Sequence, residues 1–150
     1  MATNRERIKG RRNTKPFFQF PREILDSAEY AKMSAIAVKL LLDLCSQYRG
    51  NNNGDLCCAW KLMVQRGWKS RDTLFRAISD LENNGWIERT RQGGRNKPNL
   101  YAVTWIAIDE CKGKLDVRET RVASNKWKEP VTRLSCEPYT DTVSVRANAH

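Results

Sequence analysis

Residues 68–89 read WKSRDTLFRAISDLENNGWIER, and this stretch decides the fold. Ser70 is a good helix N-cap, and Asp72 places a negative charge in the first turn, where the helix dipole favours it. Apolar residues then recur at the spacing of a helix that buries one side, namely Leu74, Ala77, Ile78 and Leu81. The run Asn83-Asn84-Gly85 ends the helix, and strand-forming residues follow. The stretch therefore predicts a capped amphipathic helix that leads directly into a strand.

A basic hairpin is predicted after this helix. Residues 86–91 (WIERTR) and 99–105 (NLYAVTW) are rich in strand formers, and the segment 92–98 (QGGRNKP) separates them. Gly93 and Gly94 allow the backbone to turn and to approach a neighbour closely.

Two further helices and a short strand are predicted on the N-terminal side. A helix begins after Ser34, is dense in apolar residues and ends at the Gly/Asn run 50–54. Residues 55–58 read as a short strand of the kind that pairs with a hairpin. Residues 59–66 form a short helix that Gly67 ends. Before them, 15–21 suit an extended aromatic segment, and 22–27 a helical turn.

This order of elements resembles the winged helix-turn-helix family over about residues 30–108. The resemblance is carried by 68–89, where the helix ends in Leu-Glu-x-x-Gly-hydrophobic-Ile, and by 100–105 (LYAVTW), which looks like a returning wing strand. It implies an α+β fold: a three-helix core with a short strand and a C-terminal β-hairpin wing. We expect a flexible basic arm over 1–15, the winged helix-turn-helix domain over 16–112, and a weakly ordered tail over 113–150.

The positive charge of the chain is concentrated in two segments. The formal net charge is +10. Residues 1–15 hold six basic residues and one acidic residue, residues 60–97 hold nine basic and four acidic, and the remainder balances. A basic excess confined in this way is typical of contact with a polyanion, and a solubility charge with a basic tail is the alternative.

The resemblance implies that the helix after Ser70 enters the major groove of DNA. With the apolar stripe subtracted, the outward residues are Lys69, Ser70, Arg71, Thr73, Arg76 and Ser79. We favour a capping role for Ser70, and an intrahelical Arg76–Asp80 pair remains an alternative to base contact. In the hairpin, Arg89 and Arg91 alternate onto one face of a strand, and Arg95 and Lys97 would reach the minor groove or a phosphate row.

The sequence therefore predicts a sequence-specific double-stranded DNA-binding protein, a transcriptional regulator or replication-initiation module that resembles accessory proteins of phages and plasmids. Two alternatives stay open: a protein-docking or inhibitor module without DNA binding, and a binder of structured RNA. If Asp72, Asp80 and Glu88 interrupt the positive face, docking becomes the better interpretation. The tail 113–150 is a candidate for contact with a protein partner, and a homodimer is one of the open oligomeric states.

Catalysis and metal binding are not expected. The five cysteines show no metal-ligand spacing, and the only histidine is His150. No nucleophile–base pair and no phosphate-binding glycine loop is visible, so we expect a non-enzyme without cofactors or metals. No secretory signal and no apolar run of membrane-spanning length occurs, which predicts a soluble cytoplasmic protein with reduced thiols.

Overall fold

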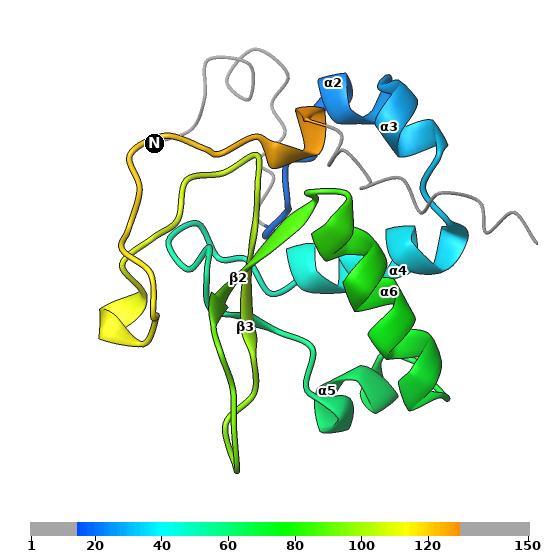
Figure 1. Cartoon of the computed structure of the whole chain (residues 1–150). Helices are drawn as coiled ribbons and strands as arrows, with labels where there is room; N and C mark the ends of the chain where they lie inside the picture. Colours follow the sequence, from blue (N-terminus) through cyan, green and yellow to red (C-terminus); the bar gives the residue numbers. More distant parts are fainter. Residues whose placement is uncertain (1–14, 130–150) are drawn as a thin grey trace, which may run out of the picture.

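The computed structural model describes residues 15–129, which form an α+β arrangement (Figure 1). This part of the chain contains five α-helices, two short 3₁₀ turns and one antiparallel sheet of three strands. The helices are α2 (Arg22–Leu25), α3 (Ala28–Ala31), α4 (Ala35–Cys45), α5 (Trp60–Gln65) and α6 (Arg71–Asn83). The strands are β1 (Leu56–Cys57), β2 (Ile87–Arg91) and β3 (Leu100–Val103), and the 3₁₀ turns are η1 (Cys111–Gly113) and η2 (Lys126–Lys128).

The longer helices begin and end where local chemistry dictates. The Ser34 hydroxyl accepts a hydrogen bond from the Ala37 amide (3.2 Å), and the Ser70 hydroxyl accepts one from the Thr73 amide (3.3 Å). Gly67 and Gly85 follow α5 and α6 with φ of +90° and +74°, a conformation that glycine adopts without steric cost. Both capped helices therefore start where the sequence predicts.

The sheet has the strand order β1-β3-β2. Strand β1 pairs with β3 as Leu56 opposite Tyr101, and β2 pairs with β3 on the other side. An irregularity lies between Arg89, opposite Tyr101, and Arg91, opposite Leu100. Because successive residues of a strand point to opposite faces, this register places Arg89 and Arg91 on opposite faces of the hairpin. The prediction that Arg89 and Arg91 lie on the same face of the strand is wrong, because the regular alternation of side chains does not continue through a bulge.

The core lies where α4 and α6 pack together beside β2 and β3. Leu40, Leu44, Leu81 and Trp86 are almost completely buried there. Burying such side chains contributes about 1.5–3 kcal/mol each. Helix α4 is apolar on most sides, as its sequence indicates, although Leu42 remains 54% exposed. This core fixes how α6 and the hairpin sit relative to each other.

The packed unit continues beyond the predicted end of the domain at residue 112. Trp127 is buried and stacks on Trp86, with ring centroids 5.3 Å apart and planes 9° apart. The Asn125 amide donates to the Thr104 carbonyl (2.7 Å), and the Asp116 amide donates to the Thr90 carbonyl (2.9 Å). Residues 113–129 are therefore part of the domain, which corrects the expectation of a weakly ordered tail from residue 113. The rest of that predicted tail (130–150) and nearly all of the predicted arm (1–14) lie outside the described residues.

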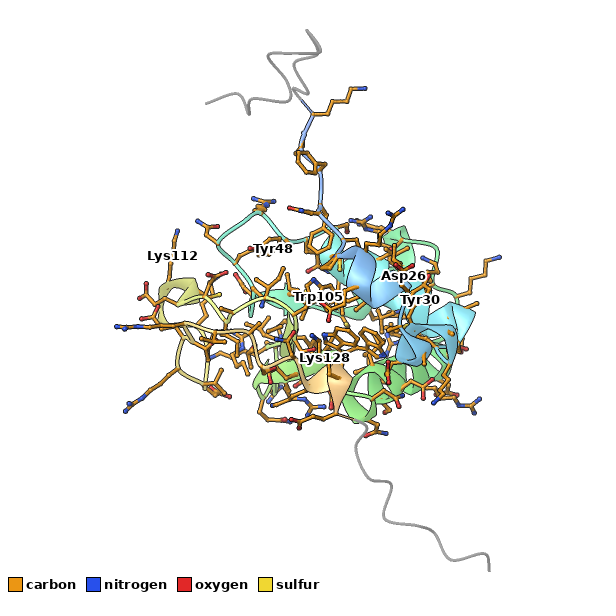
Figure 2. The ribbon with its side chains drawn as sticks, turned by 90° about the horizontal axis from the view of Figure 1, so that it is seen from above. Asp26, Tyr30, Tyr48, Trp105, Lys112 and Lys128 are labelled. Atoms are coloured by element: carbon orange, nitrogen blue, oxygen red, sulfur yellow. The ribbon has the colours of Figure 1, made fainter. Side chains whose placement is uncertain are left out.

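The two ends of the molecule are formed by different elements. The tip of the β2–β3 hairpin, α5 and the start of α6 lie at one end, and α2 and α3 lie at the other (Figure 1). Figure 2 looks onto the α2–α3 end, where Tyr48 and Trp105 lie beside the extended N-terminal segment. Phe18 contacts Tyr48 edge-on at 5.8 Å between ring centroids, and Phe20 lies 5.3 Å from Trp105. Among residues 15–129, no helix combines the length and apolar character required to span a membrane.

Candidate nucleic-acid interface

An open groove of about 510 Å³ runs between α6 and the hairpin. It is lined by Cys58–Trp60 before and in α5, by one side of α6, and by Arg89, residues 92–94 and 97–99, and Tyr101 of the hairpin. Its cations are Arg71, Arg89 and Lys97, and its aromatic residues are Trp60, Phe75 and Tyr101. None of the described residues that line it is acidic. The groove therefore combines positive charge with apolar surface, which suits a polyanion that also carries flat or apolar groups.

Arg71 is the first residue of α6, and its guanidinium lies over the Trp60 ring at 5.4 Å from the centroid. A cation at a helix N-terminus opposes the helix dipole, so this position does little for the stability of α6. The contact with Trp60 contributes about 0.5–1 kcal/mol and orients the guanidinium. Arg71 takes part in no ion pair among residues 15–129, which leaves its charge available to a ligand.

Arg89 enters the groove from β2 and is held by several partners. Its guanidinium pairs with the Glu82 carboxylate at 3.0 Å, donates to the Gln92 side chain at 2.7 Å and lies 5.9 Å from the Tyr101 ring centroid. The hydrogen bond to Glu82 raises the pKa of Arg89, so the guanidinium stays charged. Glu82 neutralises part of that charge, and Arg89 is thus a positioned cation rather than a free one.

The hairpin tip projects with little support from the rest of the molecule. Gly94 and Lys97 exchange backbone hydrogen bonds of 3.0 and 3.1 Å, and Asn96 adopts φ +62° in the turn between them. A Cβ on Gly93 would collide with the Lys97 carbonyl, whereas one on Gly94 would meet nothing within 4 Å. Close approach therefore requires Gly93, and Asn96 supplies the left-handed turn residue. The side chains of Arg95 and Lys97 are exposed.

The remaining predicted site residues do not join this groove. Lys69 is exposed before α6, Ser70 caps the helix, and Thr73 is half-buried. Arg76 lies in a neighbouring hollow that Phe75 and Ser79 share with the groove. On the hairpin, Arg91 donates across it to the Pro98 carbonyl (3.0 Å), and Arg95 is at the tip.

Acidic residues meet the positive surface at two places: Asp80 lies beside Arg76, and Glu82 pairs with Arg89. Asp80 lines the hollow that contains Arg76, although the two form no ion pair within the described part of the chain. Glu88 pairs with Lys126, and Asp72 is exposed in the first turn of α6. Arg71, Arg89 and Lys97 thus share one groove, and Arg76 occupies a mixed surface next to it.

Sequence reasoning missed the most exposed apolar residue of α6. Phe75 is 62% exposed and borders both the groove and the hollow. Phe75 lies outside the apolar stripe that defines the buried side of α6. An apolar residue at such a position is the sequence signal that could have identified Phe75 as an exposed surface residue. Trp60 and Tyr101 also line the groove, where the guanidinium groups of Arg71 and Arg89 lie over their rings.

The thiols near the core are held in the protonated state. Burial raises the pKa of Cys45 to about 12, and burial raises the pKa of Cys58, which lines the groove. A protonated Cys58 adds no negative charge to the groove and is a weak nucleophile.

Comparisons with known proteins find no matching family model and no matching curated protein. Among solved structures, the chain is similar to one described as the N-terminal domain of a DNA binding protein, with 25% sequence identity. That match covers 69% of this chain and 81% of the other chain, with a TM-score of 0.36.

Proposed function

We propose that this chain is a winged helix-turn-helix protein that binds double-stranded DNA sequence-specifically, with α6 as recognition helix and the β2–β3 hairpin as wing. The order α4, β1, α5, α6, β2, β3 and the pairing of β1 with β3 support this fold. The single observation that carries the function is the groove that holds Arg71, Arg89 and Lys97 without an acidic lining residue.

The dimensions and chemistry of B-DNA fit these residues. Its major groove, about 12 Å wide, admits an α-helix, and the N-terminal part of a recognition helix lies nearest the base edges. Arg71 is at that end of α6 and can donate to two acceptors of a guanine. Lys69, Thr73 and Arg76 flank it on exposed or half-buried positions and can contact bases or phosphates.

The hairpin would contact the phosphate backbone beside the major groove. Arg89 is oriented by Glu82, and Lys97 and Arg95 are on the projecting tip. Phosphate contacts from such cations supply affinity without reading sequence. Arg91 faces the other side of the hairpin, so it would add to duplex affinity only through the long-range electrostatic attraction between the protein and the DNA.

The decisive experiment is selection of binding sites from random duplexes, followed by anisotropy titrations on the selected site and on a scrambled duplex. We expect the wild type to prefer the selected site, and Arg71→Ala/Arg76→Ala to lose that preference. Each lost base contact should cost about 1–3 kcal/mol of discrimination. The matched control is Arg22→Ala/Lys32→Ala, which removes two exposed cations from α2 and α3–α4 at the opposite end.

Absence of duplex binding would overturn this proposal. Non-specific duplex affinities typically lie at Kd of about 10⁻⁴–10⁻⁶ M at physiological salt. A wild-type protein that binds neither duplex in that range would instead support a docking module, and preferential competition by RNA duplexes would support an RNA binder.

The biological role that we propose is transcriptional regulation or replication initiation in a mobile genetic element, within the cytoplasm. This part of the proposal rests on the family resemblance of residues 68–89. Locating the selected sequence next to a promoter or within a replication origin distinguishes the two roles. Sedimentation with and without the selected duplex tests whether the protein binds as a homodimer, and removal of 130–150 tests whether that segment contacts a protein partner.

A further inference from the structure

Phe75 is an apolar side chain on the surface of α6 that the core does not use. It is 62% exposed, whereas Leu74, Ala77, Ile78 and Leu81 supply the buried side of the helix. Phe75 lies one turn after Arg71 and one turn before Ser79, and all three line the groove.

The surroundings of Phe75 specify what kind of ligand can cover it. The groove on one side carries the cations Arg71, Arg89 and Lys97, and the hollow on the other side carries Arg76 beside Asp80. A partner of this surface must therefore be an anion that also presents an apolar group. In the major groove of DNA the only apolar group on a base edge is the thymine 5-methyl.

We infer that Phe75 is a specificity-determining residue that packs against a thymine 5-methyl group in the major groove. This inference rests on the proposed DNA-binding function and extends it to a base preference. Four residues of helix advance about 6 Å, and stacked base pairs are about 3.4 Å apart. The thymine should therefore lie about two base pairs from the guanine that Arg71 contacts.

The test replaces single thymines in the selected duplex by deoxyuridine, which removes only the methyl group. For the wild type, we expect Kd to rise about fourfold at one or two thymines and to be unchanged at the others. Phe75→Ala should bind the thymine and uracil duplexes equally, and its melting temperature should stay at the wild-type value. Phe75→Leu, which keeps an apolar side chain, should retain part of the difference.

Leu42→Ala is the matched control, because Leu42 is a comparably exposed apolar residue of α4 that does not line the groove. This variant should keep the full difference in Kd between the thymine duplex and the uracil duplex. If the wild type binds the selected site but its Kd does not rise when any thymine is replaced by deoxyuridine, the role of Phe75 is overturned and the proposed function stands. If Kd rises equally in the wild type and in Phe75→Ala, the role of Phe75 is also overturned. If the wild type binds no duplex, both proposals fall together.

Discussion

The molecule contains two loops with turn-forming Gly and Asn residues that have opposite structural roles. The loop 50–54 (GNNNG) consists of Gly and Asn alone, and the hairpin tip 92–98 (QGGRNKP) contains two Gly and one Asn beside two cations. The first is held to the core by the hydrogen bonds of Asn53, and the second projects from the rest of the molecule (Figure 1). Composition therefore predicts that a segment is a loop, but it does not predict whether the loop supports the fold or reaches a ligand.

Asn53 shows how the first loop is tied in. Its side chain is 0% exposed, donates to the Val103, Ile106 and Ala107 carbonyls at 2.9–3.0 Å and accepts from the Val103 amide at 2.9 Å. Its backbone amide and carbonyl bond to Asp109. In the tip, by contrast, the Arg95 and Lys97 side chains form no hydrogen bond within residues 15–129.

The largest expected effect is the loss of Asn53. Asn53→Ala should lower the free energy of unfolding by about 3 kcal/mol or more, because buried polar groups of β3 and the following residues lose their partners. Urea denaturation of both proteins measures it. Asn51→Ala in the same loop is the control: Asn51 is exposed, and its loss should change stability by less than about 0.5 kcal/mol. Equal effects at both positions would show that the buried side chain of Asn53 does not anchor this loop to the core.

The second prediction compares the two glycines of the tip. Gly93→Ala should destabilise the protein by about 1–3 kcal/mol, because the added Cβ forces the hairpin backbone to shift. Gly94→Ala should be neutral or slightly stabilising, since the space around it is open. Thermal unfolding of the pair is the measurement, and a larger loss for Gly94→Ala would contradict the described geometry of the tip.

The third prediction concerns the exposed cations of the tip. Arg95→Ala/Lys97→Ala should leave the melting temperature unchanged and weaken binding to selected and scrambled duplexes by a similar factor, roughly tenfold or about 1.4 kcal/mol. The slope of log K against log salt should become shallower by about 2. Salt titrations of both duplexes measure this, with Arg22→Ala/Lys32→Ala as the control of equal charge. A loss confined to the selected duplex would assign base reading to the tip instead.

The smallest expected effect concerns Arg89, at the base of the hairpin between the fixed and projecting regions. Glu82→Gln keeps the size of the side chain but removes the charge that neutralises Arg89. Stability should fall by less than about 1 kcal/mol, because the ion pair is partly exposed. Affinity for any duplex should rise slightly at low salt, and anisotropy titrations measure the rise. Weaker binding would show that orientation by Glu82 matters more than the freed charge.

The candidate site could be predicted in part. The outward positions of Arg71 and Arg76 followed from the helical period, and the exposed tip followed from the turn residues. The opposite orientation of Arg89 and Arg91 could not be predicted, because a bulge depends on the register with β3 rather than on either residue. The support of Arg71 by Trp60 also escaped prediction, since an aromatic residue in an apolar row can serve the core and the surface together.

The sequence by itself determined the elements: Ser34 and Ser70 begin α4 and α6, Gly67 and Gly85 follow the ends of α5 and α6, and the segments 86–91 and 99–105, rich in strand formers, form a hairpin. These features are local, because caps, turns and periodicity depend on residues a few positions apart. Only the tertiary structure decided that Asn53 is buried, that Trp127 completes the core against Trp86, and that Arg71, Arg89 and Lys97 line one groove. Each outcome brings together segments more than 15 positions apart, as with Asn53 and Val103, Trp86 and Trp127, or Arg71 and Arg89, and the packing of α4, α6 and the sheet places them side by side.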